Sequence, residues 1–342
     1  MSLPGKLQTT AMAVMPHTEL DTALDLALSL DIPFWPQLPL YDYREDMYVQ
    51  AAEHFPGIIL DLEKESLRFS TAKFIRELEE TLAHFEEPEY FDVSPEYSVV
   101  YHRFLKLDLK KRAAIRGQLE GPVSFGLFIK NEEDDRPIIF DDTVRPFLYE
   151  FMARRVNVQL ARLKRRNANA FMFVDEPGLQ FLFSAMSGYS DTLARDDIAN
   201  FLALIDRPRG IHLCGNPDWD FLLAFDMDIV SIDLYSNARI LPLYRRSIIN
   251  FIKRGGTIVW GIVPTNIEPF KKETPDRLIA LLETTWQGLI DDGLDRDLLF
   301  ERSLLSPATC CLVNPDQEKT VTLAFSQLRQ ISSTLRETYK LL

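Results

Sequence analysis

The sequence predicts an α/β fold, a (β/α)8 TIM barrel with a helical insertion after the second strand. Short apolar segments bounded by turn residues alternate along the 342-residue chain with longer segments of helical period. Most of the short segments are apolar on both faces, as buried parallel strands are. Polar or metal-binding residue types recur where these segments end. Active sites in this architecture are built at that end of the strands, so the pattern favours a barrel over an open sheet.

Eight segments have the length and composition of barrel strands. They are residues 7–15, 33–38, 118–125, 170–174, 210–214, 229–234, 257–262 and 303–309. Helical patterns lie between them. Thr18 is positioned to cap a helix whose apolar stripe runs from Leu20 to Leu28, and residues 143–164 and 274–290 have the same kind of pattern.

The stretch from Tyr41 to Arg116 is too long for a single crossover between two strands. We predict that it is an insertion, at about 41–116, with one or two helices and an extended piece at 57–61. The chain has no internal repeat, no low-complexity segment and no Gly/Ser-rich linker. We therefore expect one barrel domain over residues 1–342.

The overall composition indicates the cellular compartment and disfavours some classes of binding partner. The formal net charge is -13, which disfavours a nucleic acid partner. The most basic stretch, on a predicted helix, is expected to be a solvated face; it contains Arg154, Arg155, Arg162, Lys164, Arg165 and Arg166. No run of eighteen apolar residues predicts a membrane span, and residues 1–8 do not resemble a signal peptide. We expect a cytoplasmic protein.

The chain has three cysteines, Cys214, Cys310 and Cys311, and all of them lie near predicted strand ends. An odd, small number argues against a disulfide framework and for metal or redox chemistry. His212 and Cys214 are two residues apart in a strand, so their side chains point to the same side. Cys310 closes the last strand, and in a barrel both strand ends face one mouth.

One imidazole and two thiolates suit Zn²⁺, and three protein ligands leave one position open, as in catalytic zinc sites. The alternative is that His212 and Cys214 are a satisfied core pair and Cys310 an inert buried thiol. Because neighbouring residues of a strand alternate in direction, we assign Cys310 as the ligand and Cys311 as a packed neighbour. Asp233 is a candidate fourth ligand, and a helix cap is the alternative for it.

Six segments resemble, in order, those of the C-terminal barrel of cobalamin-independent methionine synthase and of zinc-dependent methylcobamide:thiol methyltransferases. These enzymes share a barrel superfamily with uroporphyrinogen decarboxylase. The matching segments are TTAMAVMPHT at 9–18, GPVS at 121–124, FVDEP at 173–177, HLCGN at 212–216, DIVSID at 228–233 and PATCCL at 307–312.

The resemblance implies a zinc-dependent methyltransferase that activates a small thiol, homocysteine or a similar compound. It implies His212, Cys214 and Cys310 as zinc ligands, and it places Asp233 where the family has a zinc-binding glutamate. It also implies that Asp175 holds the amino group of the acceptor. Zinc would lower the pKa of the thiol, so that a thiolate attacks the methyl group.

Two departures from methionine synthase concern the donor and the pocket. Met12, Ala13 and Val14 replace an Ile-Gly-Ser segment near the substrate, so only backbone contacts are retained there. Val263 replaces the histidine that protonates the departing folate. A methyl-corrinoid such as methylcobalamin needs no such proton, because cobalt is the leaving group. The differences therefore favour a corrinoid donor, carried by a small partner protein, over methyl-folate.

Two alternatives to this function remain at the level of the sequence. A uroporphyrinogen decarboxylase-like enzyme would need early arginines, and residues 32–39 contain none. A non-catalytic zinc- or ligand-binding barrel would not need substrate-holding carboxylates, and Asp175 and Glu176 argue against it. His17, at the end of the first strand, is a further candidate for the pocket, with a turn residue as the alternative.

Overall fold

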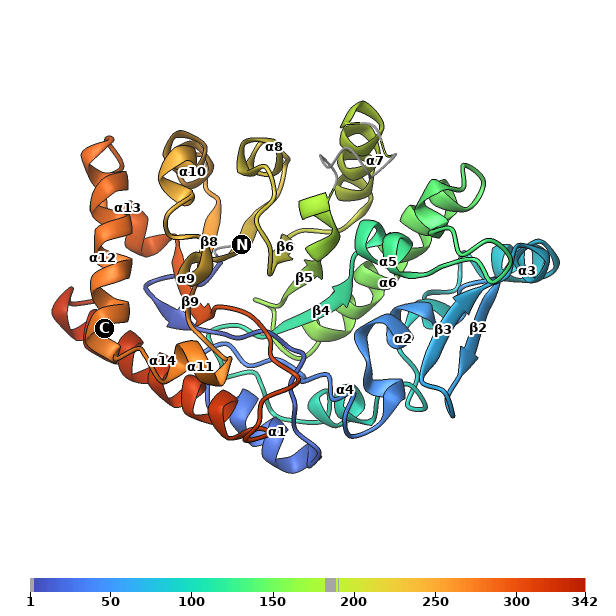
Figure 1. Ribbon diagram of the computed structural model, residues 1–342, viewed down its shortest axis with the longest axis horizontal. Helices are drawn as coiled ribbons and strands as arrows, with labels where there is room; N and C mark the ends of the chain where they lie inside the picture. The colour runs from blue at the N-terminus through green and yellow to red at the C-terminus, as the bar shows by residue number, and fades with distance from the viewer. Residues whose placement is uncertain (1–2, 182–188, 190, 342) are drawn as a thin grey trace.

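The computed structural model describes residues 3–181, 189 and 191–341, and its centre is a parallel sheet that curls into a barrel (Figure 1). Seven strands lie in the order β1-β9-β8-β7-β6-β5-β4, and each neighbouring pair is parallel. They are β1 (Gln8–Thr9), β4 (Arg116–Glu120), β5 (Phe171–Asp175), β6 (Arg209–Leu213), β7 (Ile229–Asp233), β8 (Thr257–Val263) and β9 (Ser303–Pro307).

The predicted second strand lies between the two edges of this sheet, although only isolated bridges define it. Phe34 forms a parallel bridge to Arg116 of β4, and Gln37 forms a parallel bridge to Val14, which follows β1. Residues 33–37 therefore connect the β1 edge to the β4 edge. The predicted (β/α)8 barrel is confirmed, with one strand reduced to two bridges.

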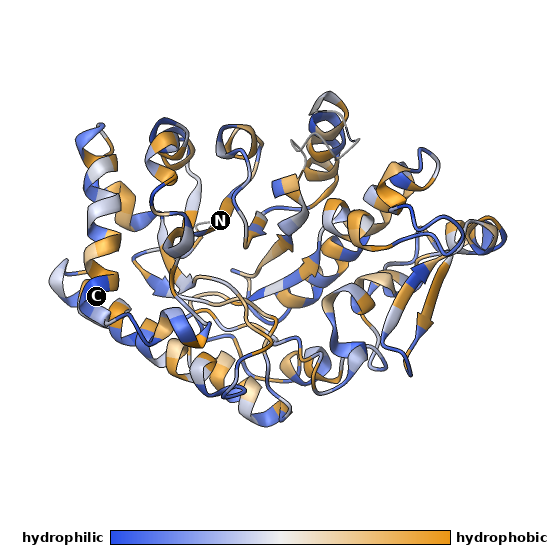
Figure 2. Cartoon of the chain, viewed as in Figure 1, coloured by the Kyte–Doolittle hydropathy of each residue, from blue (hydrophilic) through white to orange (hydrophobic). Residues whose placement is uncertain are grey.

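Helices surround the barrel and fill the insertion. They are α1 (Leu20–Leu28), α2 (Met47–Ala52), α3 (Thr71–Ala83), α4 (Val99–Phe104), α5 (Pro122–Phe128), α6 (Val144–Lys164), α7 (Asp191–Leu204), α8 (Trp219–Leu223), α9 (Leu234–Asn237), α10 (Arg245–Lys253), α11 (Ile267–Phe270), α12 (Pro275–Asp291), α13 (Arg296–Glu301) and α14 (Lys319–Thr338). Figure 2 shows apolar and polar residues on different sides of the surrounding helices. In α14, for example, Val321, Leu328 and Leu335 are buried. Among the described residues, none of the helices has the length and apolar composition needed to cross a membrane.

Three element boundaries differ clearly from the sequence prediction. The first strand, predicted at 7–15, is reduced to β1 at Gln8–Thr9. Helix α1 begins at Leu20 with Glu19 at its N-cap, so Thr18 is not the capping residue. The predicted strand at 118–125 ends at Glu120, and the chain turns at Gly121 into α5. Proline is favoured in the first turn of a helix because its missing amide would have no partner there, so Pro122 explains the early end of the strand.

The insertion at 41–116 contains the predicted extended piece, and it has three α-helices, α2, α3 and α4, where one or two were predicted. Its extended piece is β2 (Ile58–Asp61), which forms an antiparallel hairpin with β3 (Ser66–Phe69). Arg155 of α6 is fully buried and donates to the carbonyls of Gln50 and Glu53 at 2.6 and 2.9 Å. The predicted solvated basic face is therefore wrong for Arg155, which fixes the insertion to the barrel.

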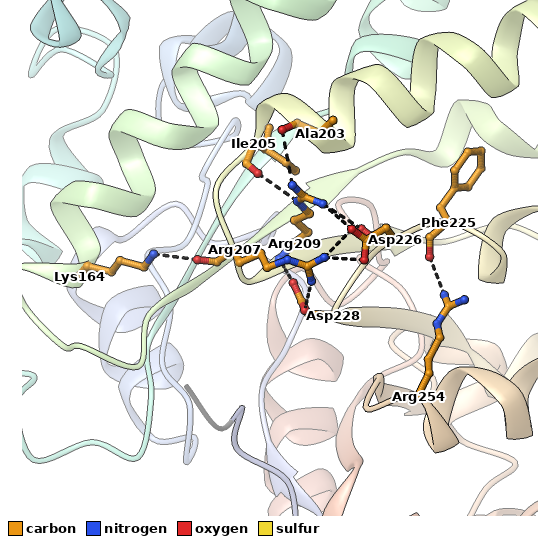
Figure 3. Close-up of polar contacts among 9 residues, drawn as sticks. All are labelled: Lys164, Ala203, Ile205, Arg207, Arg209, Phe225, Asp226, Asp228 and Arg254. Atoms are coloured by element: carbon orange, nitrogen blue, oxygen red, sulfur yellow. Dashed lines mark hydrogen bonds and ion pairs between the residues drawn. The ribbon is translucent and has the colours of Figure 1, made fainter.

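An ion network lies where β6 and β7 begin (Figure 3). Arg207 pairs with Asp226 and Asp228, and Arg209 pairs with Asp226 at 2.8 Å. Asp228 also accepts the backbone amide of Arg209 at 2.7 Å. The starts of the strands form the face of a barrel that is used for stability rather than chemistry, and this network connects two of them there.

Candidate active site

The register of the sheet directs three polar side chains to the same side at the ends of β4, β5 and β6. Glu120 lies opposite Asp175, and Asp175 lies opposite His212. Phe171 and Phe173, which precede Asp175 at intervals of two, belong to the apolar cluster inside the barrel. Because side chains alternate along a strand, Asp175 points to the barrel interior, and its register partners point the same way.

The structure brings the three predicted zinc ligands into contact. His212 Nε2 lies 2.9 Å from Cys214 Sγ, and the thiols of Cys214 and Cys310 are hydrogen-bonded. This hydrogen bond lowers the pKa of Cys310 and, together with burial, raises that of Cys214. Burial, assisted by the charge of Arg116, lowers the pKa of His212 to about 3. The imidazole is therefore neutral at physiological pH, as a metal ligand must be.

The residues fit a zinc ion by chemical type. His212 Nδ1 is buried and has no hydrogen-bond partner among the described residues. Two donors on one tetrahedral zinc lie about 3.5 Å apart, given bonds of about 2.0 and 2.3 Å. At 2.9 Å, His212 and Cys214 instead form a hydrogen-bonded pair. Within the described residues, no group of three or more His, Cys, Asp or Glu side chains is arranged to hold a metal ion, and zinc stays a prediction.

Cys311 and Asp233 make contacts of another kind. The Cys311 thiol donates to Asn266 Oδ1 at 3.2 Å and to the Val313 carbonyl at 3.5 Å, so it points away from Cys214. Asp233 is buried and is the N-cap of α9, where its carboxylate accepts the Ser236 amide at 2.9 Å. The structure thus gives Asp233 the helix-capping function that was the alternative to zinc binding.

Arg116, which the sequence did not single out, is a buried cation beneath Asp175. It is 1% exposed, donates to Thr10 Oγ1 and Gln118 Oε1 at 3.1 and 2.9 Å, and lies over the ring of Phe34. Burial raises the pKa of Asp175 to about 8; the charge of Arg116 opposes this shift, while Cys310 and Glu176 add to it. Arg116 therefore favours the ionised form of the predicted ammonium-binding carboxylate.

The carboxylate of Glu176 accepts hydrogen bonds from the first turn of α5. Its carboxylate accepts the amides of Val123 and Ser124 at 3.0 and 2.8 Å and the Ser124 hydroxyl at 2.7 Å. A Cβ at Gly121 would lie only 2.2 Å from this carboxylate, so glycine is required there. Both oxygens are occupied, and Glu176 stabilises a helix N-terminus instead of standing free for the substrate contact that the sequence suggested.

We predict that Glu176→Gln lowers the free energy of unfolding by about 1–3 kcal/mol, because the amide nitrogen of glutamine would face backbone amides that need an acceptor. Urea denaturation at pH 8 measures the free energy of unfolding of the variant and of the wild type. Glu268→Gln, on the exposed face of α11, is the control and should change stability by less than about 0.5 kcal/mol. Equal stability of the two variants would contradict the capping function.

The remaining predicted pocket residues lie in the segment that follows β1. His17 is fully buried, and its Nε2 lies 3.5 Å from the Thr322 hydroxyl of α14. The Ala13 carbonyl accepts the Gln37 amide at 2.9 Å, so the second strand already uses this backbone contact. Met12 is buried and Val14 half-buried. The contacts of His17 and Ala13 are therefore with the barrel wall and α14.

Glu120 and Tyr48 are the other site residues that the sequence did not single out. Glu120 is 3% exposed at the end of β4, and the phenol of Tyr48, from α2 of the insertion, hydrogen-bonds to it. The sequence shows that Glu120 is a carboxylate in a predicted strand. It was missed because the strand was predicted to continue past Gly121 and Pro122, which placed Glu120 in the middle of the strand and not at its end.

Comparison with solved structures supports the fold. A B12-independent methionine synthase from Shewanella sp. W3-18-1, solved in complex with selenomethionine, aligns with 100% of this chain over 97% of its own, at a TM-score of 0.55 and 13% identity. An endo-1,4-β-mannanase from Rhizomucor miehei aligns over 95% of each chain at a TM-score of 0.43 and 10% identity, too low to carry an argument. No model of a known protein family and no curated protein matches the sequence. The chain therefore has a methionine synthase-like TIM-barrel fold.

Proposed function

We propose that this protein is a zinc-dependent methyltransferase that activates a small thiol of the homocysteine class. The observation that carries the proposal is the contact of His212, Cys214 and Cys310 at the ends of β6 and β9, with a neutral imidazole. These three residues would hold the ion. A zinc ion bound there would lower the pKa of an acceptor thiol, so that its thiolate is present at neutral pH.

The protein's own groups would orient the acceptor. Asp175 is half-buried at the end of β5, and its carboxylate would pair with an ammonium group of the acceptor. Burial raises its pKa to about 8 although Arg116 below it favours the charged form, so pairing with an ammonium group would help to keep the carboxylate ionised at neutral pH. The methionine synthase of similar fold was solved with selenomethionine, an amino acid that carries a methyl group on selenium. That ligand supports an amino acid thiol as the acceptor here.

The donor we propose is a methyl-corrinoid carried by a partner protein. Val263 ends β8, is fully buried, and supplies no proton to a leaving group. A folate leaving group requires protonation, whereas a corrinoid leaves without it. We expect a small partner protein to carry the corrinoid.

We predict that the purified protein retains about one zinc per chain and releases a proton when it binds homocysteine, because a bound thiol ionises. Metal analysis after dialysis gives the zinc content, and a pH-indicator dye gives the proton release. His212→Ala should lose most of the zinc and the proton release. Protein that retains no zinc after zinc loading, or binds the thiol without proton release, would contradict the proposal.

A further inference from the structure

A cavity of about 400 Å³ lies at the end of the barrel where the strands begin, opposite the end that carries Cys214 and Cys310. Its lining includes Lys6 just before β1, Arg302 directly before β9 and Arg336 in the last turn of α14. Pockets that hold small molecules typically measure about 300–1,000 Å³. The cavity is therefore large enough for a small ligand, and it is separate from the thiol site.

Two arginines of this cavity lack hydrogen-bond acceptors. Arg302 is half-buried, and its guanidinium group has no hydrogen bond or ion pair within the described chain. The Nε of Arg336 is also buried without a partner, and its Nη1 lies 3.6 Å from Asp31, whose other oxygen already accepts from Thr9. Donors that have lost water and gained no acceptor are costly. The two guanidinium groups therefore point to a missing acceptor.

A second cavity, of about 210 Å³, adjoins the first, since Leu3 and Arg302 line both. It extends to Arg207 and Asp228, which belong to the ion network of Figure 3 and pair with each other. The charge of Arg207 is thus compensated by a neighbour, whereas that of Arg302 is not. The unpaired positive charge belongs to the first cavity.

Positive charge exceeds negative charge around the first cavity. Lys6, Arg302 and Arg336 contribute three cations, and Glu301 is the one carboxylate among the described lining residues. The side chain of Glu301 is exposed to solvent. The whole chain has a net charge of -13, so this cluster opposes the charge of the rest of the protein. An anion is the ligand that would neutralise it.

A strained turn holds Lys6 at the cavity. Lys6 and Leu7 have φ of 56° and 59°, in the left-handed region that residues other than glycine seldom adopt. Their amides donate to the carbonyls of Phe300 and Ser303 at 2.7 and 2.9 Å, which anchors the turn on both sides of Arg302. Strain of this kind is concentrated at functional sites, because surrounding contacts must maintain it. The turn thus keeps Lys6 beside Arg302.

We propose that this cavity binds a small phosphate monoester, with its phosphate group on Arg302 and Arg336 and with Lys6 as a third cation. A guanidinium group matches phosphate oxygens with two parallel hydrogen bonds. A phosphate monoester carries a charge of about -1.5 to -2 at pH 7, close to the excess of positive charge in the lining. The volume leaves room for the organic group. The site needs neither zinc nor a methyl donor, so it stands apart from the proposed function.

The test is a calorimetric titration of the purified protein with glycerol 3-phosphate, inorganic phosphate and glycerol, in chloride buffer of constant ionic strength. We expect glycerol 3-phosphate to bind and glycerol not to bind. Arg302→Gln should weaken the binding at least about tenfold, as expected for loss of a hydrogen bond between charged groups. Arg246→Gln removes the same charge from an exposed position of α10 and should keep the wild-type affinity.

Thermal unfolding in phosphate-free buffer separates lost binding from a damaged fold. Because the Arg302 guanidinium has no partner within the described chain, Arg302→Gln should unfold within about 1–2 °C of the wild type. Glycerol 3-phosphate should then raise the Tm of the wild type and of Arg246→Gln, but not that of Arg302→Gln. Lys6→Gln, at an exposed position, is a second variant and should weaken binding about two- to fivefold.

Three results would overturn the inference. The first is an absence of glycerol 3-phosphate binding to the wild type. The second is equal affinity of the wild type, Arg302→Gln and Lys6→Gln, which would place the ligand elsewhere. The third is inorganic phosphate that binds more tightly than glycerol 3-phosphate, which would assign the cavity to free phosphate and not to a monoester.

Discussion

Cys310→Ser is expected to remove most of the bound zinc, whereas Cys311→Ser should leave it nearly intact. The Cys310 thiol is hydrogen-bonded to Cys214, which also contacts His212. A serine hydroxyl is a poor zinc ligand, because zinc prefers thiolate and imidazole in such sites. The Cys311 thiol only donates hydrogen bonds to Asn266 and Val313, and a serine hydroxyl can donate in the same way.

The two variants form a matched pair, since the same substitution is made at adjacent positions. Metal analysis after dialysis against a weak chelator measures zinc per chain, and circular dichroism with thermal unfolding checks the fold. Retention of zinc by Cys310→Ser together with its loss from Cys311→Ser would mean that the register of this segment is wrong by one residue. Retention by both would place the metal on other residues.

The barrel was predictable because its signals are local. Apolar runs of strand length and the apolar stripes of helices can be recognised within short stretches of the sequence. All eight predicted strands have counterparts in the structure, the second of them as isolated bridges. The ends of strands and helices were less predictable where one segment has features of both a strand and a helix. Residues 121–125 are apolar enough for a strand, but Pro122 starts a helix and Glu176, distant in sequence, caps it.

The metal-ligand candidates were predictable from alternation and topology, and the pocket around them was not. His212 lies in β6 and Cys214 directly follows this strand, two residues on, and the barrel brings Cys310 to them. Asp233 and Glu176 have residue types that serve equally as ligands and as helix caps, so sequence alone could not assign them. Arg116 and Tyr48 act through contacts between distant elements, which no local pattern encodes.

Methyl transfer to homocysteine is expected from methylcobalamin and not from methyl-folate. The structure places Val263, an apolar and fully buried residue, at the end of β8 where the resemblance implies a proton-donating histidine. Without that donor a folate amine would have to leave as an anion, which is unfavourable, whereas the cobalt of a corrinoid leaves unaided. The assay measures methionine formed by zinc-loaded protein with each donor in parallel, with Val263→Ala as a control that supplies no proton either.

Asp175→Asn should lower kcat/KM for homocysteine by about 100-fold, because removing one partner of a buried charge pair typically costs 2–5 kcal/mol. The same variant should change the rate with 4-mercaptobutyrate far less, since that thiol has no ammonium group to lose.

In the comparison of the two methyl donors, a robust rate with methyl-folate would contradict the assignment of a corrinoid donor and leave the activation of the thiol in place. Absence of transfer from either donor, across a panel of thiols and with zinc bound, would instead favour a barrel that holds its ligand without turning it over.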